Sequence, residues 1–477
     1  RMVEVTKKGI VNNVLWNAVE KYSSQGISLL VSIVMARILT PAEYGIIGII
    51  SVFIGIANIF INSGIGKALI AKKDCSIVDY STANWINVSI SICCYIILFL
   101  LSPVIADFYE MPIIAPTLRV MTLAFIFGAF AGVSRTKLSK EMKFKKISIA
   151  TLATSIFSGI IGITMAHAGF GVWALVYQTV LSALFSSVWI ISISGFRPNF
   201  RFSKRSFIEL YSFGGKLLCS EIIWVIYNNI YPLIIGKGFN AQSVGYYTRA
   251  SSYAQLVPVN FSGILENVLF PAFANIQDDM DRMVRLYRKA LTISSCFVFT
   301  GNFFLMGLAH PLILNIISEK WLPCVPLLQI LCLSTMFGHI TSINGRLLIA
   351  KGYPGIFLKM SAVTQPLTLS IIFISFWGGI VGLAWGAATS SILGTIYCCH
   401  IFKRTIGINP IKCLKDSFKI LILSGVIGLG AMISFKYWIA PTICNLLFIF
   451  CCMCLLYIGG LKFLTPQILN EIRSIRK

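Results

Sequence analysis

Apolar stretches of about 20 residues follow one another almost from end to end of this 477-residue chain. An α-helix needs about 20 apolar residues to cross the hydrocarbon core of a bilayer, so each stretch predicts a membrane-spanning helix. None of the gaps between the stretches is long enough for a folded extramembrane domain. The fourteen predicted spans cover residues 13–37, 43–66, 83–105, 113–134, 147–167, 171–195, 209–236, 250–275, 291–318, 326–350, 357–377, 380–402, 417–436 and 442–461.

The composition agrees with a membrane protein. Hydrophobic residues make up 57% and charged residues 12% of the chain, whereas about 25% of the residues in ordinary soluble domains are charged. The mean hydropathy is +0.82. The fold class is therefore predicted as an all-α polytopic membrane protein with 14 transmembrane helices.

Basic residues fall mainly into every second gap between the predicted spans. Residues 135–146 hold one Arg and five Lys, and residues 282–289 hold three Arg and one Lys. Cytoplasmic loops collect Lys and Arg, so these gaps are predicted to be cytoplasmic, with both termini on the same side. The net charge of +23 then reflects topology and contact with anionic lipid, and it does not indicate nucleic-acid binding. The other gaps hold only Arg37, Lys237, Arg249, Lys320 and Lys436.

The chain also contains an internal repeat. Six predicted helices separate the two copies, so both copies begin on the same side of the membrane. We expect two six-helix lobes around a central cavity, at residues 1–207 and 208–404, followed by two extra C-terminal helices within residues 405–477. The aligned pairs are Arg37 with Lys237, Gly45 with Gly245 and Leu69 with Leu269 at an offset of 200, and Pro116 with Pro326 and Gly169 with Gly379 at an offset of 210.

Polar and ionisable residues recur at helical spacing within several predicted spans, which places them on one face. A charged side chain near the bilayer centre costs about 2.5–3.5 kcal/mol on insertion scales, so such residues usually face a bundle interior or water. Pairing or snorkelling at helix ends is the alternative for each charge, and for the two outer arginines both explanations stay open. The predicted cavity residues are Glu20, Lys21, Asn58, Asn62, Lys216, Glu221, Trp224, Tyr227, Asn228, Glu266, His339 and Arg346, with Arg119 and Arg249 nearer the outer end.

Neither a catalytic site nor a metal site is predicted. Most of the 14 cysteines lie inside apolar spans, where small packing roles are typical. There is no Walker A pattern, and the short outer loops leave no platform for the catalytic residues of a membrane polymerase or ligase. We expect no cofactor beyond a coupling ion, and spacing does not decide between H⁺ and Na⁺.

Three motifs carry a resemblance to a known family. They are Ala36–Leu39 followed by Glu43–Gly45, the run Leu269–Asp279, and Glu319–Trp321. In these residues the chain resembles the multidrug/oligosaccharidyl-lipid/polysaccharide superfamily, and more closely its WzxC-like bacterial polysaccharide flippases. The similarity spans nearly the whole chain, and the family's fold agrees with 14 helices in two lobes.

The resemblance implies transfer of an undecaprenyl-pyrophosphate-linked oligosaccharide across the bacterial inner membrane by alternating access, for lipopolysaccharide or exopolysaccharide synthesis. The implied partners are membrane lipids, a polysaccharide polymerase and chain-length machinery. We expect Lys216 and Arg346 to bind the pyrophosphate, because phosphate inside a membrane needs compensating cations. An ion-coupled multidrug exporter of the same fold stays open, although its cavity would be expected to hold acidic residues without matching cations. Rocking of the lobes is expected to use glycine contacts at Gly159, Gly162 and Gly171.

Overall fold

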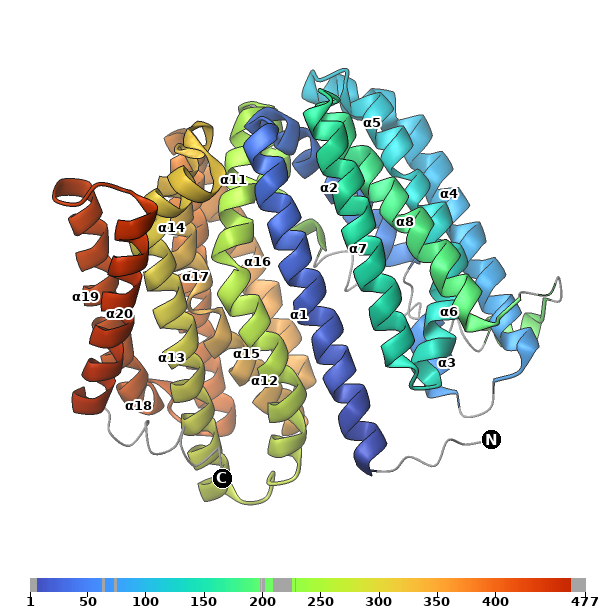
Figure 1. Cartoon of the computed structure of the whole chain (residues 1–477). Helices are drawn as coiled ribbons and strands as arrows, with labels where there is room; N and C mark the ends of the chain where they lie inside the picture. The colour runs from blue at the N-terminus through green and yellow to red at the C-terminus, as the bar shows by residue number, and fades with distance from the viewer. Residues whose placement is uncertain are drawn as a thin grey trace. The chain divides into compact units, whose positions relative to one another are not determined.

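The computed structural model describes residues 7–61, 65–72, 75–197, 199, 202–208, 225–227 and 229–464, and within these ranges it contains helices and no strand. This confirms the all-α class (Figure 1). The helices are α1 (Lys7–Ile38), α2 (Pro41–Ile61), α3 (Ile65–Ala71), α4 (Ile77–Tyr109), α5 (Ile114–Met121), α6 (Leu123–Lys140), α7 (Phe144–His167), α8 (Val172–Ser194), α10 (Ile230–Gly238), α11 (Ala241–Ala254), α12 (Leu256–Ala274), α13 (Met280–Leu312), η1 (Ile313–Ile317), η2 (Glu319–Trp321), α14 (Cys324–Thr335), α15 (Gly338–Ala350), α16 (Pro354–Ser375), η3 (Phe376–Gly378), α17 (Gly379–Ile406), α18 (Pro410–Cys413), α19 (Lys415–Tyr437) and α20 (Ile443–Leu464).

Ten stretches of the described chain are long and apolar enough to cross a membrane. The chain is therefore a multi-pass membrane protein. Its residues form two compact units, unit 1 (Arg1–Gly245) and unit 2 (Tyr246–Lys477). The lobes predicted from the repeat, residues 1–207 and 208–404, are a different division of the chain and stay a prediction.

Unit 1 is built from long helices that pack lengthwise. α1 lies along α7, α7 along α8, and α4 and α8 both pack on α6. Gly159 of α7 makes room for α1, because a Cβ on it would lie 2.6 Å from Val31 Cγ2. Gly162 of the same helix faces Gln178 of α8, with a corresponding distance of 3.0 Å. Both contacts lie within unit 1, and the expectation that these glycines allow the lobes to rock stays a prediction.

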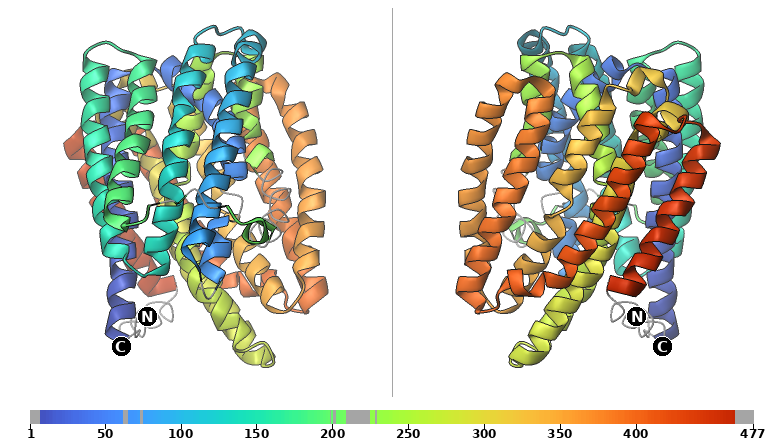
Figure 2. Two further views of the ribbon diagram at one scale, coloured as in Figure 1. Left: turned by 90° about the vertical axis from the view of Figure 1, so that its right-hand side faces the viewer. Right: turned by 90° about the vertical axis from the view of Figure 1, so that its left-hand side faces the viewer.

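Unit 2 is organised around α13. The view from the side of the C-terminal helices shows α19 running along α13, with α20 beside it (Figure 2). Two glycines allow the backbones of α13 and α19 to meet. A Cβ on Gly307 would lie 2.5 Å from the Gly428 carbonyl oxygen, and a Cβ on Gly428 would lie 2.5 Å from the Phe303 carbonyl oxygen. Within unit 2, α19 therefore packs onto α13 through small residues, as is common between membrane helices.

The repeat is visible in the backbone. At the 200-residue offset, α1 and α10 end at Ile38 and Gly238, and α2 and α11 begin at Pro41 and Ala241; at the 210-residue offset, α5 and α14 begin at Ile114 and Cys324, and α7 and α16 at Phe144 and Pro354. Left-handed backbone recurs in two further pairs: Met142 (φ 55°) with Gly352 (φ 83°), and Gly169 (φ 82°) with Gly379 (φ 69°). The sequence repeat therefore corresponds to a repeat of helix boundaries and of turns.

Two glycines related by the repeat each lie against the start of the other's helix within unit 1. A Cβ on Gly45 would lie 1.6 Å from the carbonyl oxygen of Ala241, and a Cβ on Gly245 would lie 1.9 Å from that of Pro41. The contact is reciprocal, as in a two-fold interface where residue i meets j and j meets i. Only glycine allows the starts of α2 and α11 to approach this closely.

The residues before these two helix starts cap them. The Glu43 amide donates to Thr40 Oγ1 at 3.4 Å, and the Thr40 amide donates back to Glu43 Oε2 at 2.6 Å. The Ser243 amide donates to Asn240 Oδ1 at 2.8 Å. Thr40 and Asn240 are themselves 200 residues apart, so both copies begin this helix with a side-chain cap.

Candidate functional site

A polar pocket of about 370 Å³ lies between α1, α6 and α7 in unit 1. Its lining combines charged and hydroxyl side chains with a few apolar ones. α1 supplies consecutive turns of its polar stripe, and α6 supplies its last turns before the basic loop. The lining residues are Glu20, Lys21, Ser24, Arg135, Ser139, Phe144, Ile147 and Thr151.

Glu20 is the centre of this pocket. Its Oε1 accepts hydrogen bonds from Arg135 Nη2 at 2.8 Å and from Thr151 Oγ1 at 3.1 Å. The Glu20 side chain is 13% exposed, whereas that of Arg135 is 45% exposed. The carboxylate is thus held by α6 and α7 while its cationic partner reaches toward the pocket mouth.

Two further α1 residues give the pocket capacity for a polar ligand. Lys21 lines it with an exposed ammonium. Ser24 Oγ is buried there and has no hydrogen-bond partner among the described residues. A buried hydroxyl usually finds a partner, so this oxygen offers a donor and an acceptor to a molecule that enters. The pocket can therefore bind a group that carries both hydroxyls and charge.

The sequence predicted Glu20 and Lys21 as cavity residues, and the structure brings them together in this pocket. Sequence reasoning missed Arg135 and Thr151. Arg135 was attributed to the basic cytoplasmic loop, because it opens a run of six basic residues. Nothing in the sequence separates it from the other five, since only its partner Glu20, more than 100 residues away, distinguishes it.

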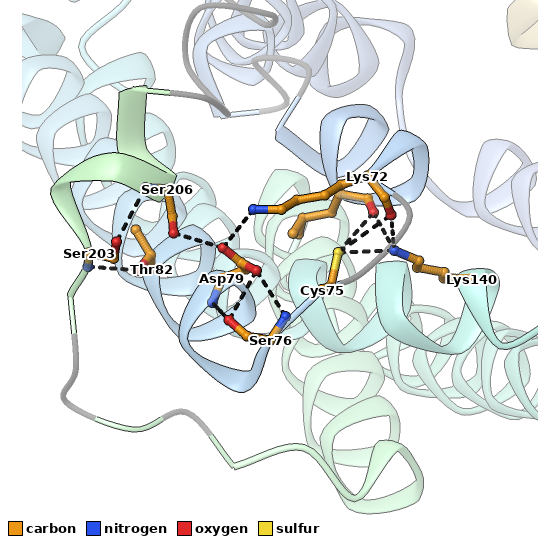
Figure 3. Close-up of polar contacts among 9 residues, drawn as sticks. Lys72, Cys75, Ser76, Asp79, Thr82, Lys140, Ser203 and Ser206 are labelled. Carbon is orange, nitrogen blue, oxygen red and sulfur yellow. Dashed lines mark hydrogen bonds and ion pairs between the residues drawn. The ribbon is translucent and has the colours of Figure 1, made fainter. Parts of the chain in front are cut away.

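A second polar cluster in unit 1 joins α3, the start of α4 and the segment that follows α8 (Figure 3). Its hub is Asp79, which is only 5% exposed. Asp79 Oδ1 accepts from Lys72 Nζ at 3.0 Å and from Ser206 Oγ at 2.7 Å. Its Oδ2 accepts from the Ser76 amide at 2.8 Å and completes a capping box at the start of α4.

Asn199 and residues 202–208 are held to α4 by this cluster and by its neighbours. The Ser203 amide donates to Thr82 Oγ1 at 3.1 Å, and the Asn199 amide donates to Ser81 Oγ at 3.0 Å. Lys140 of α6 closes the other side, where its Nζ donates to the Leu69 carbonyl oxygen at 2.9 Å (Figure 3). The sequence carried one signal for this cluster, the capping box Ser76-x-x-Asp79 before an apolar run.

Arg119, predicted near the outer end of the cavity, packs against α4. Its Nε donates to Ser102 Oγ at 2.7 Å, and its guanidinium lies 4.4 Å from the centre of the Phe99 ring. Close by, Lys237 Nζ donates to Glu110 Oε1 at 2.9 Å and lowers the pKa of that carboxyl, first through the hydrogen bond and then through its charge. Both contacts connect the end of α4 to neighbouring helices of unit 1.

His339 is fully buried in unit 2. Its Nε2 lies 3.1 Å from Ser295 Oγ, and its Nδ1 lies 2.8 Å from the Met336 carbonyl oxygen. The edge of its ring meets Phe299. These contacts describe a packed histidine between α13 and α15, and a role for His339 in the cavity stays a prediction.

The remaining predicted cavity residues are distributed over several helices. Asn58 on α2, Tyr227, Arg249 on α11 and Arg346 on α15 are half-buried. Glu266 belongs to α12, but its side chain is not described. Asn62, Lys216, Glu221, Trp224 and Asn228 lie outside the described residues. Among the side chains that the structure covers, no three His, Cys, Asp or Glu residues are grouped to hold a metal ion.

Comparison with protein families gives one match over more than half of the chain. The family described as "Polysaccharide biosynthesis protein" matches residues 34–326. The lipopolysaccharide biosynthesis protein WzxC of Escherichia coli is 27% identical over 421 residues, which cover 87% of this chain and 83% of that protein. The teichuronic acid biosynthesis protein TuaB of Bacillus subtilis is 23% identical over 447 residues and covers 92% of each chain. The succinoglycan biosynthesis transport protein ExoT of Rhizobium meliloti is 24% identical over 330 residues, 69% of this chain and 67% of that protein.

Two solved structures resemble the fold. The lipid II flippase MurJ, in an inward closed conformation, has a TM-score of 0.75 with 17% identity and covers 96% of this chain and 100% of its own. An inward-facing multidrug resistance MATE family transporter of the MOP superfamily has a TM-score of 0.61 with 15% identity, over 81% of this chain and 99% of its own. At these identities the likeness concerns the fold alone.

Proposed function

Because this chain belongs to the polysaccharide biosynthesis protein family, we propose that it is a flippase that moves a lipid-linked oligosaccharide across the bacterial inner membrane. One combined observation carries the proposal. The relatives that match most of the chain include a lipopolysaccharide biosynthesis protein, and the fold matches the lipid II flippase MurJ over its whole length. In this proposal the protein is a transporter and not an enzyme, and its cargo is a saccharide on undecaprenyl pyrophosphate, made for lipopolysaccharide or exopolysaccharide.

The proposed topology has 14 spans and both termini in the cytoplasm. The longest apolar stretch, residues 359–406, supports a higher count than ten because it holds two helices, α16 and α17, that pack on each other. Three predicted spans have no counterpart among these ten stretches, at residues 13–37, 209–236 and 250–275; of the second, only residues 225–227 and 229–236 are described. The first and third carry polar residues at helical spacing. Polar faces are expected of helices that line a hydrated cavity.

The cargo's charge and hydroxyls have separate candidate partners. Lys216 and Arg346 are proposed to bind the pyrophosphate through charge-assisted hydrogen bonds. The pocket around Glu20 supports a role in sugar binding or in coupling, because its carboxylate, hydroxyls and cations lie within one small volume. H⁺ and Na⁺ both stay candidates for the coupling ion.

A multidrug exporter of the same fold is the second candidate, and the MATE-like fold supports it. The mixed charge of the pocket favours the flippase, because Glu20 is neutralised by Arg135 at 2.8 Å and a site for organic cations would leave its carboxylate available. Polymerase and chain-length proteins are proposed partners.

Deletion of the gene in a strain with no second copy tests the proposal. We expect loss of surface polysaccharide and accumulation of the lipid-linked saccharide in the inner leaflet. Restoration by the wild-type gene, and not by a gene for a MATE exporter, is the control. Unchanged surface polysaccharide together with new sensitivity to cationic drugs would favour the exporter.

A further inference from the structure

An elongated apolar cleft of about 800 Å³ lies in unit 1 between α2 and α4, and residues of the 202–208 segment complete its wall. It is separate from the pocket around Glu20, because the two share no lining residue. Phe53, Ala57 and Phe60 line it from α2, and Phe202 and Phe207 from the segment.

The α4 wall of the cleft is one continuous helix face. Its lining positions between residues 86 and 101 recur three or four residues apart, as one face of an α-helix requires. From Trp85 to Leu101 this face is about 24 Å long at 1.5 Å per residue. That length is most of the roughly 30 Å thickness of a bilayer's hydrocarbon core. The cleft is therefore a long slot and not a compact ligand pocket.

The chemistry of the cleft fits hydrocarbon. Ser89 carries the only hydroxyl among its lining residues. The Trp85 indole N–H, the other strong donor, is satisfied by the Asn199 carbonyl oxygen at 3.0 Å. Dividing the volume by the length gives a cross-section of about 33 Å², which leaves room for the methyl branches of an isoprenoid chain.

The equivalent helix pair in the second copy is packed closed. The 200-residue offset relates Ala57 of α2 to Val257 of α12. Val257 fills the space beside Gly301 of α13, where a Cβ would lie 2.7 Å from Val257 Cγ1. Phe261 stacks on Phe297 at 4.9 Å between the same two helices. At these described positions the two helices of the second copy are thus in direct contact, where the first copy has the slot.

One end of the cleft is basic. Phe202 and Phe207 flank Lys204 and Arg205, and Arg197 precedes them; all three basic side chains are exposed. The segment that carries them is held to α4 by the Asp79 cluster (Figure 3). An apolar slot with cations fixed at one end complements a long hydrocarbon chain that ends in phosphate.

We propose that this cleft binds the part of the carrier lipid's polyprenyl chain nearest its phosphate, with the phosphate end toward Arg197, Lys204 and Arg205. The inference rests on the proposed function, since it assigns a place to the tail of the same cargo. A helix from another protein is a poorer fit. The close helix contact in unit 2 uses Gly307 against Gly428, whereas the α4 wall presents Ile90, Cys93 and Ile97.

The test uses the full chain in proteoliposomes with undecaprenyl phosphate that carries a photoactivatable diazirine in its chain. Labelled peptides are mapped by mass spectrometry. We expect labelling of residues 86–101, and a loss of about tenfold in Cys93→Trp, because the added ring occupies the slot. Ile96→Trp on the lipid-facing side of the same helix is the matched control and is expected to keep its labelling. Ser89→Phe is a second variant that fills the slot, so that misfolding of one variant does not decide the result.

Four outcomes would overturn the inference. Equal labelling of the cleft by phosphatidylglycerol with a diazirine in its acyl chain would make it a general lipid slot. Cross-links from Cys93 to another polypeptide would assign it to a partner helix. Labelling elsewhere in the protein, with α4 unlabelled, would reject the cleft as the binding site of the chain while leaving the proposed function intact. No labelling anywhere would count against the proposed function as well.

Discussion

The α2–α4 pair and the α12–α13 pair occupy the same place in the two copies of the repeat. Between their described residues, the first encloses an apolar slot, whereas the second packs Val257 against Gly301 and Phe261 against Phe297. The copies share helix boundaries, left-handed turns and a reciprocal glycine contact. They differ in where the small residue stands: Ala57 and Leu101 of the first copy correspond to Val257 and Gly301 of the second. The two copies therefore share a backbone plan and differ in the side chains that meet between these two helices.

The largest effect is expected where the copies are most alike. In Gly45→Ala and Gly245→Ala the new Cβ would meet a backbone carbonyl oxygen at 1.6 and 1.9 Å. Each should destabilise the protein by roughly 3 kcal/mol or more, because the backbone must move. Thermal unfolding in detergent measures this, with Gly26→Ala as the control, since nothing lies within 4 Å of that helical glycine. Tolerance of one substitution but not of the other would break the reciprocal relation.

The next effect separates the copies. Asp79 and Asp279 are 200 residues apart and stand at the starts of α4 and α13. Asp79 is buried with several partners, whereas Asp279 is exposed and accepts from the Arg282 amide at 2.9 Å. Asp79→Ala should lower the free energy of unfolding by about 2–3 kcal/mol, because Lys72 and Ser206 lose their hydrogen-bond acceptor. Asp279→Ala should lower it by about 1 kcal/mol, because only a helix cap is lost. Equal losses would show that the Asp79 cluster adds nothing beyond capping.

The Glu20–Arg135 pair lies in the first copy, and the offsets place Ser220 and Gly345 at the equivalent positions. Arg135 is 45% exposed, so Arg135→Gln should cost only about 1 kcal/mol of stability. Transport should fall much further. The exchanged double variant Glu20→Arg with Arg135→Glu should recover abundance but not transport. Full transport by either single variant would reduce the pair to a packing contact.

The smallest effect compares two turns. Met142 and Gly352 adopt the same left-handed backbone, which disfavours a side chain. Gly352→Ala should cost about 1 kcal/mol, and Met142→Gly should stabilise the protein by about 0.5 kcal/mol. Thermal midpoints of both variants provide the measurement. A loss of stability in Met142→Gly would indicate that the methionine side chain contributes packing that outweighs the strain.

The helices could be predicted because about 20 apolar residues in a row have few alternatives in a bilayer. The repeat could be predicted because Gly45 and Gly245 sit where close backbone contact allows no other residue. Arg135 could not be predicted as a pocket residue. The six basic residues of its run look alike in the sequence, and only the structure places one of them beside Glu20. The cleft could not be predicted either, because it depends on the gap left between two apolar helices, and apolar patterns do not encode gaps.

Flipping by the purified protein is the most direct test of the central claim. Proteoliposomes that contain the full chain would be loaded with a fluorescent polyprenyl-pyrophosphate oligosaccharide, and a quencher that does not cross the membrane would report its leaflet. The account predicts exchange between leaflets that depends on the protein and is lost in Arg135→Gln, while Ile96→Trp remains active. Movement no faster than in empty vesicles, with an intact and folded protein, would contradict it.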